Sequence, residues 1–197
     1  MCNSYILITT TRHTTPRTRA LVKELVFSID HIIKINRGKM SILDLFYRAK
    51  QLNCSRVIIV GRGLHGNPGR ITFLMTDRSK PVFYPLILKL SGIKLAKEMG
   101  VSLRSQPRKT VPVVVSNISK EGSEILEFAQ ELAAAINRPF LEVDYNILKE
   151  DFENVILVKR NKKAKHCVSI YSLRDDKVAG PTILVEKTVY LSLPIEY

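Results

Sequence analysis

The chain of 197 residues carries 31 Lys and Arg against 18 Asp and Glu, a formal net charge of +13, and 45% of its residues are hydrophobic. This composition is typical of a soluble globular protein with room for a sizeable core, either one large domain or two closely packed halves. It excludes a membrane-spanning helix, because no apolar run of about 18 residues is present, and the N-terminus lacks the pattern of a secretory signal.

The first half is predicted to alternate strands and helices. Strands are expected at residues 5–8, 31–35, 56–60, 71–75 and 82–95, the last with Pro85 on an edge or at a bulge. One helix is predicted to begin at Pro16, capped by Thr15. A second begins at Ser41, where Asp44 has the spacing of a capping box.

The second half repeats this pattern 107 residues later, since Ile6, Leu7 and Ile8 match Val113, Val114 and Val115. We predict a strand at 111–115, a helix at 121–137, a second strand at 140–143, a shortened helix at 145–152, and strands at 155–158, 167–173 and 182–193. The expected fold is therefore α/β, with a mixed sheet in each of two pseudo-repeated halves. These halves span residues 1–99 and 111–197, joined by 100–110.

Positive charge is concentrated in the first half. Residues 1–110 hold 20 Lys and Arg against 5 Asp and Glu, a net charge of +15, whereas residues 111–197 have a net charge of −2. This asymmetry favours a polyanion as the partner. The alternative is a solvated basic surface that only aids solubility.

A Gly-rich segment, GRGLHGNPGR at residues 61–70, follows a predicted strand and matches the pattern G-x-G-x-x-G. A dinucleotide site of this kind needs a helix directly after the loop, and here Asn67, Pro68 and a β-type run follow instead. We therefore predict a hairpin connection that presents Arg62, His65 and Arg70 to phosphate groups. An enzyme that binds a phosphorylated ligand at this loop remains an alternative.

Arginines crowd the start of the first helix, at Arg12, Arg17 and Arg19, where the helix dipole disfavours cations. The matching helix of the second half opens with Glu121 and Glu124. This contrast predicts an anion bound at the first helix N-terminus, with accidental surface arginines as the alternative. A second basic segment, KRNKKAK at 159–165, is placed between two strands like the Gly-rich loop.

The sequence offers little for catalysis or cofactor binding. The four histidines are isolated, no Cys/His cluster has metal-ligand spacing, and no carboxylate pair stands out as acid and base. Three scattered cysteines, Cys2, Cys54 and Cys167, predict reduced thiols in a cytoplasmic protein rather than disulfides. We therefore expect no enzyme activity, no metal and no cofactor. Trp is absent and no aromatic RNA-binding motif is found, so contacts to phosphates and RNA shape are favoured over base stacking.

Three segments together resemble the Brix-domain family of ribosome-biogenesis proteins, especially its archaeal single-domain members: ILITTTRHTTPRTRALVKEL from Ile6, INRG from Ile35 and VIIVGRGLHGNPGRITFL from Val57. The resemblance covers nearly the whole chain. It implies two halves that are each similar to the anticodon-binding domain of class IIa aminoacyl-tRNA synthetases. It also implies binding of precursor rRNA during small-subunit maturation, with guide RNA and other ribosome-assembly proteins as further partners. A general module for structured, tRNA-like RNA is the alternative.

The candidate RNA-binding residues combine these segments. Phosphate contacts are expected from Arg12, Arg17, Arg19, Arg37, Lys39, Arg62, His65 and Arg70, with hydroxyl donors at Thr9, Thr10 and Thr11 unless these are a strand end. The second half would extend the surface through Lys159, Arg160, Lys162, Lys163 and Lys165.

Overall fold

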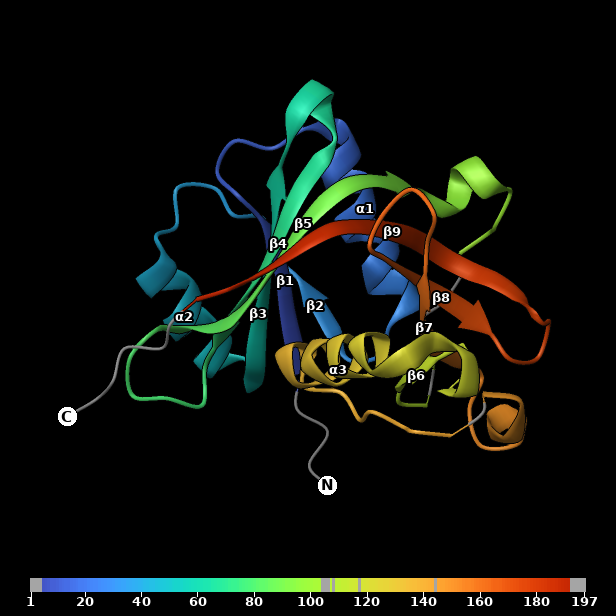
Figure 1. Ribbon diagram of the computed structural model, residues 1–197. Helices are drawn as coiled ribbons and strands as arrows, with labels where there is room; N and C mark the ends of the chain where they lie inside the picture. The colour runs from blue at the N-terminus through green and yellow to red at the C-terminus, as the bar shows by residue number, and fades with distance from the viewer. Residues whose placement is uncertain (1–4, 104–106, 108, 117, 144, 192–197) are drawn as a thin grey trace.

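The computed structural model contains a single sheet of nine strands in the order β2-β1-β3-β4-β5-β9-β8-β7-β6 (Figure 1). It describes residues 5–103, 107, 109–116, 118–143 and 145–191, with the side chains of 118–120, 145 and 146 left aside. Cys2, parts of the connection at 100–110 and the end of the strand predicted at 182–193 lie outside these residues.

The elements follow the predicted succession with shifted ends. The strands are β1 Tyr5–Thr10, β2 Ile32–Lys34, β3 Cys54–Arg62, β4 Pro68–Met75, β5 Val82–Lys94, β6 Val113–Val115, β7 Asn154–Arg160, β8 His166–Ser172 and β9 Lys177–Tyr190. The α-helices are α1 Pro16–Ser28, α2 Ile42–Gln51 and α3 Ile118–Ile136. Three short 3-10 turns are η1 Leu64–Gly66, η2 Ala96–Met99 and η3 Tyr145–Lys149.

The prediction of a separate sheet in each half is wrong, because β5 and β9 join the two. They pair antiparallel from Leu86 opposite Tyr190 to Lys94 opposite Thr182. On either side the strand order repeats. β1 lies parallel to β3, which continues antiparallel to β4 and β5. In the same way β6 lies parallel to β7, which continues antiparallel to β8 and β9.

Local sequence signals at the element ends are confirmed. The Thr15 side chain accepts the Thr18 N–H at the start of α1, with Pro16 as the first helical residue. Ser41 and Asp44 form a complete capping box on α2. Pro85 lies at a bulge, since the pairing of β4 with β5 steps from Leu74–Phe83 to Thr72–Ile87. A central strand can hold proline only where a ladder hydrogen bond is missing, as it is at a bulge.

Three predictions in the second half are corrected. The helix begins at Ile118 rather than Glu121, and Gly122 interrupts it with a φ of 69°. The strand expected at 140–143 is reduced to one bridge between Phe140 and Val113. The shortened helix at 145–152 is a 3-10 turn over Tyr145–Lys149.

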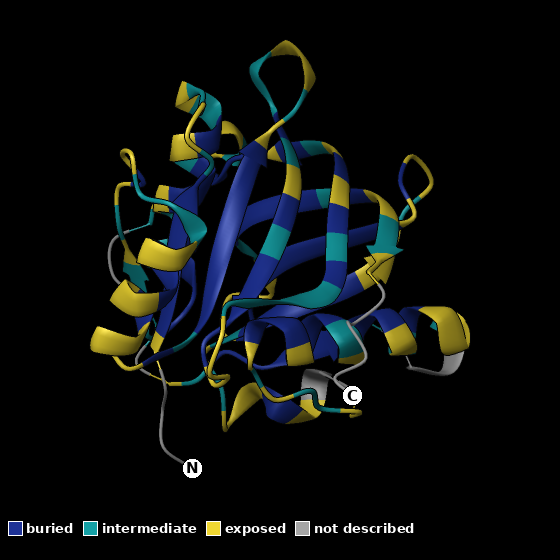
Figure 2. Cartoon of the chain, turned by 90° about the vertical axis from the view of Figure 1, so that its left-hand side faces the viewer, coloured by how far each residue is buried: buried dark blue, intermediate teal, exposed yellow. Residues whose placement is uncertain are grey.

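One face of the sheet carries the main core. Helices α1 and α3 both pack on this face, and side chains from strands of both halves join them in one cluster. On the opposite face, α2 covers a smaller cluster in the first half around Leu7 and Phe46, and Leu148 belongs to another in the second half. Between α2 and the second-half cluster, strands cross the middle of Figure 2, and no described helix lies in front of them. Part of the sheet is therefore left free on this face.

A buried ion pair joins the two halves on the core side. Asp30 follows α1, Arg138 follows α3, and their side chains are 2% and 5% exposed with 3.5 Å between Arg138 Nε and Asp30 Oδ1. Arg138 Nη2 also donates to the Asp30 carbonyl at 2.7 Å, and Asp30 Oδ1 accepts the Val111 N–H at 2.9 Å. Burial lowers the pKa of Arg138, and the neighbouring Asp30 charge opposes that shift. The two side chains, one from each half, therefore partly neutralise each other's buried charge.

Removing one partner of this pair is expected to destabilise the whole fold. Arg138→Met leaves the buried Asp30 carboxylate with the His31 ring, 2.7 Å from Oδ2, as its remaining side-chain partner, so the free energy of unfolding should fall by about 3 kcal/mol in urea denaturation. Asp30→Asn in the Arg138→Met background keeps an acceptor for the Val111 N–H and should recover part of this loss. Arg48→Met, at an exposed position of α2, serves as the control, with an expected change within about 0.5 kcal/mol. Equal losses of stability in Arg138→Met and Arg48→Met would contradict a structural role for the pair.

Candidate nucleic-acid interface

The Gly-rich segment forms the tight hairpin that joins β3 to β4. Gly63 and Gly69 face each other across its neck, and a Cβ atom added at Gly69 would lie 2.4 Å from the Gly63 Cα. The Gly63 N–H donates to the Asn67 carbonyl, and the single turn η1 closes the tip with His65 at a φ of 51°. The glycines therefore serve a close backbone approach in a hairpin, as predicted, and a strand rather than a helix follows them.

A third glycine positions a candidate arginine. Gly61 lies opposite Arg70 in the β3–β4 register, and a Cβ atom on Gly61 would lie 2.9 Å from Arg70 Cγ. The Arg70 side chain therefore lies across the β3 backbone, close to Thr11, in space that any other residue at 61 would fill. Its neighbours Ile71 and Phe73 belong to the main core. Because side chains alternate along a strand, Arg70 and Thr72 face the other side, where part of the sheet is free.

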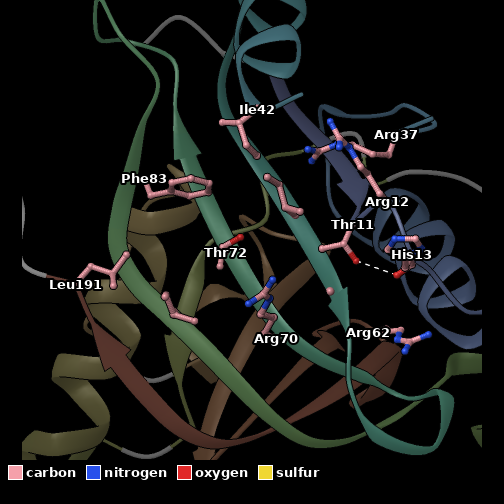
Figure 3. Close-up of a pocket in the computed structure, with 13 residues that line it drawn as sticks. Thr11, Arg12, His13, Arg37, Ile42, Arg62, Arg70, Thr72, Phe83 and Leu191 are labelled. Carbon is pink, nitrogen blue, oxygen red and sulfur yellow. Dashed lines mark hydrogen bonds between the residues drawn. The ribbon is translucent and has the colours of Figure 1, made fainter. Parts of the chain in front are cut away.

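An open pocket of about 550 Å³ lies on this side of the sheet (Figure 3). It brings together candidate residues from the segments after β1 and after β2 and from the β3–β4 hairpin. The complete set of lining residues is Thr11, Arg12, His13, Arg37, Ile42, Ile59, Gly61, Arg62, Arg70, Thr72, Phe83, Ile87 and Leu191. Four of these residues are arginines, and no lining residue among those described is acidic. The pocket is therefore a cationic concavity, the kind of surface that attracts polyanions.

Arg12 and Arg37 place two like charges close together in this pocket. Arg37 is 9% exposed, and its Nε donates to the Met40 carbonyl at 2.8 Å. Arg12 lies beside it (Figure 3), with Nη2 3.3 Å from the Lys39 carbonyl. Burial lowers the pKa of Arg37, the like charge of Arg12 lowers it further, and Asp44 opposes both effects. Two guanidinium groups are thus held together with one exposed carboxylate nearby, an arrangement that an anion would stabilise.

The predicted anion site at the start of α1 is not formed by its three arginines. Arg17 turns away, with Nη2 2.8 Å from Glu98 Oε1 and 3.3 Å from the Ile93 carbonyl. Arg12 belongs to the pocket instead, and Arg19 is exposed on α1. The Thr15 hydroxyl donates to the Gly66 carbonyl at 2.6 Å, which fixes the tip of the β3–β4 hairpin to this end of the helix. Helix α1 therefore supports the hairpin rather than gathering the arginines.

Two of the three threonines are part of the strand. Thr9 is fully buried and its hydroxyl donates to the Ile35 carbonyl at 3.0 Å, while Thr10 is 9% exposed. Neither hydroxyl is therefore presented to a ligand on the surface, which corrects their assignment as donors. Thr11 lies beyond the strand and lines the pocket, although its hydroxyl donates to the His13 carbonyl at 3.1 Å.

The basic loop of the second half joins β7 to β8, as the Gly-rich loop joins β3 to β4, but acidic residues of α3 hold part of its charge. Lys165 Nζ lies 2.6 Å from Glu124 Oε1, and the Arg160 N–H donates to Glu121 Oε2. Lys159, Lys162 and Lys163 are exposed. The two loops thus occupy matching places in the chain order, but carboxylates of α3 lie beside the basic residues of the second loop.

Beneath this loop lies a histidine without charge. His166 is 1% exposed, and its ring stacks on Phe128 with 4.0 Å between centroids. Burial lowers the pKa of His166 to about 4, with the Lys165 and Arg160 charges adding to this shift and Glu124 opposing it. His166 is therefore neutral near pH 7 and is a part of the core rather than of the basic surface.

The described residues contain no metal-ligand cluster and two buried thiols. No group of three or more His, Cys, Asp or Glu in this part of the chain is placed to hold a metal ion. Cys54 and Cys167 are buried and unpaired, and burial raises the pKa of Cys54 to about 11. None of the described helices is both long and apolar enough to cross a bilayer.

The apolar pocket residues were missed in the sequence analysis. Phe83 and Ile87 lie on β5 and Leu191 follows β9, so they reach the arginines only through strand pairing. A partial signal exists in the alternation along β5, where Leu86 and Leu88 belong to the main core and Ile87 faces the other side. Nothing local in the sequence connects β5 with Arg12 or Arg37.

Comparisons with known proteins bear on the fold and the family of this chain. No protein-family model matches the chain. The "Probable Brix domain-containing ribosomal biogenesis protein" of Pyrococcus abyssi is 32% identical over 188 residues, which cover 92% of this chain and 83% of the relative. The protein with the same description from Thermococcus kodakarensis is 29% identical over 187 residues, covering 92% and 89% of the two chains.

Solved structures share the fold. A probable ribosomal biogenesis protein from Aeropyrum pernix K1 has a TM-score of 0.78 at 22% identity and covers 98% of both chains. Mil, described as an archaeal Imp4-like protein, has a TM-score of 0.65 at 20% identity and covers 95% of this chain and all of its own. These define an α/β protein class built on one large mixed sheet. Together with the sequence relatives, they show that the chain belongs to the family of Brix domain-containing ribosomal biogenesis proteins.

The buried neutral histidine predicts loss of stability in mild acid. The unfolded chain binds a proton at His166 below a pKa of about 6.5, whereas the folded chain does so only near pH 4. Between these values the unfolded state binds more protons, so stability falls as the pH decreases, by up to about 3 kcal/mol. His166→Phe, which preserves ring stacking on Phe128, should remove this contribution when urea denaturation is compared at pH 7 and pH 4.5. His13→Gln, at an exposed position, should keep the wild-type profile, and parallel profiles for all three proteins would contradict the assignment.

Proposed function

We propose that this protein binds precursor rRNA as a non-catalytic factor in small-subunit assembly. The observation that supports the proposal most directly is the pocket in which four arginines and no acidic residue converge. Membership of the ribosomal biogenesis family supports the cellular context. The charge of the first half, +15 over residues 1–110, matches a polyanionic partner.

The proposed interface is centred on the first half. Arginines suit this role because a planar guanidinium binds phosphate oxygens through two hydrogen bonds. Arg12, Arg62 and Arg70 are exposed, whereas Arg37 is a buried residue of the pocket lining. The full proposed set is Thr11, Arg12, Arg37, Lys39, Arg62, His65 and Arg70, extended by Arg19 and by Lys159, Lys162 and Lys163 of the second half. Arg17 and Lys165 contribute less, because carboxylates already pair with them. Arg160 also contributes less, because its Nη2 donates to the Glu121 backbone carbonyl.

We further propose that the chain acts as one Brix domain with halves at residues 1–99 and 111–197 connected by 100–110, each half similar to a class IIa anticodon-binding domain. The repeated strand order and the shared core support this division. Such a body would hold RNA without reacting with it. Guide RNA and other assembly proteins are the further partners that the proposal includes.

RNA crosslinking in cells tests the proposed partner. The bound fragments should map mainly to precursor rRNA, and the crosslinked peptides should come from residues 11–19, 37–39 and 61–70. Fragments dominated by tRNA would favour the alternative of a general structured-RNA module. Thermal stabilisation of the purified protein by free nucleotides alone would instead favour an enzyme with a phosphorylated ligand.

Charge removal at the hairpin should weaken RNA binding in a salt-dependent way. Arg62→Ala with Arg70→Ala removes two phosphate contacts, so the slope of log K against log salt concentration should flatten by about one for each contact. Fluorescence anisotropy with a labelled RNA over a salt series measures this slope. The control Arg78→Ala with Lys80→Ala removes the same charge from the exposed turn after β4, and equal effects of the two double variants would mean that charge alone, without a site, accounts for binding.

A further inference from the structure

The arginine pocket has an apolar floor that phosphate binding does not require. Ile59, Thr72 and Ile87 lie along neighbouring strands β3, β4 and β5, and Phe83 lies beside them (Figure 3). Ile42 of α2 and Leu191 close two further sides. Leu191 is 44% exposed, and Ile42, Thr72, Phe83 and Ile87 are each partly exposed. Apolar surface that water can reach thus lies beside the arginines of the pocket.

The apolar floor lies where helix α2 no longer covers the sheet. Helix α2 covers the sheet over Leu7, Val57 and Leu74, and its cluster ends at Phe83. Beyond it no described helix covers β4 and β5 on this face (Figure 2), and Phe83 both packs against the α2 cluster and lines the pocket. The floor continues toward the hairpin as a second, smaller hollow that includes Lys89 and Val189 and shares Arg62, Arg70 and Ile87 with the first.

The composition of the pocket distinguishes between forms of RNA. A double helix presents phosphates, 2′-hydroxyls and the edges of stacked bases, and its base faces are hidden. It could contact the arginines but would leave the apolar floor in water. A single-stranded nucleotide carries both complementary parts, a phosphate for the guanidinium groups and an apolar base face for Phe83 and its neighbours. The volume of about 550 Å³ lies within the range of small-molecule pockets.

We propose that this pocket receives an unpaired, splayed-out RNA nucleotide, with its base on the floor formed by Thr72, Phe83 and Ile87 and its flanking phosphates on Arg12, Arg37 and Arg70. This inference rests on the proposed function and specifies which form of RNA the site selects. It also differs from the expectation drawn from aromatic content alone, because a single aromatic ring in an apolar pocket is enough to hold one base.

The test compares RNAs that differ either in the presence of one base or in being single-stranded or duplex. A single-stranded oligonucleotide of eight uridines, a set in which one position is abasic, and a blunt duplex with an equal number of phosphates are titrated against the full chain at one salt concentration. The single strand should bind at least about tenfold more tightly than the duplex. The abasic change should weaken binding by about 5- to 100-fold at the position that occupies the pocket, since stacking contributes this much per base.

Variants connect this penalty to the pocket. Phe83→Leu preserves apolar volume but removes the ring, and the ratio of affinities between intact and abasic RNA should fall toward one. Phe152→Leu is the matched control, because Phe152 packs on the small core of the second half and should leave the ratio unchanged. The abasic series on the unmodified protein needs no variant, so the result does not depend on how well Phe83→Leu folds.

The outcomes separate the two proposals. If the duplex binds as tightly as the single strand and no abasic position matters, the nucleotide pocket is refuted while RNA binding stands. If no RNA form binds even at low salt, the proposed function itself fails. A base-dependent penalty that persists unchanged in Phe83→Leu would place the base elsewhere and would also overturn the inference.

Discussion

The antiparallel pairing of β5 with β9 is the constraint on which the remaining structure depends. It joins strands about a hundred residues apart, from Leu86 opposite Tyr190 to Lys94 opposite Thr182, and makes one sheet from two repeated sets of strands. Because the sheet is continuous, α1 and α3 share one core and can bury Asp30 and Arg138 against each other. The same continuity keeps the edge strands of both halves far apart and leaves the middle of the sheet free on the opposite face.

That free region explains where the candidate site lies. The arginines come from the segments after β1 and after β2 and from the β3–β4 hairpin. Backbone carbonyls accept from Arg37 and Arg12, and the absence of a Cβ at Gly61 makes room for Arg70. Positive charges that repel one another lower stability. They are tolerated here because Arg12, Arg62 and Arg70 are exposed to solvent and counter-ions, while the buried Arg37 donates to the Met40 carbonyl and has Asp44 nearby. The cationic pocket is thus a feature that the core does not need.

Sequence reasoning succeeded where a signal is local and failed where a contact is not. The Thr15 cap, the Ser41 and Asp44 capping box, and the Pro85 bulge depend on a few adjacent residues, and the structure confirms each. The fusion of the sheets could not be predicted, since nothing near β5 indicates that β9 pairs with it. The arginines of α1 show the same limit, because Glu98, which captures Arg17, is 81 positions away along the chain. Candidate phosphate-binding residues can therefore be chosen from the sequence by type, while their grouping requires the fold.

The β5–β9 ladder also bears on how the protein is made. Strand β9 is the last described element of the chain, and it pairs on both sides, with β5 and with β8. During synthesis the first half is complete well before β9 leaves the ribosome, so β5 remains an open edge with unpaired N–H and C=O groups for that interval. Contacts of such long range also slow folding, because loop closure precedes any stabilisation. The two lysines of β5, Lys89 and Lys94, discourage pairing with other chains until its own partner strand is available.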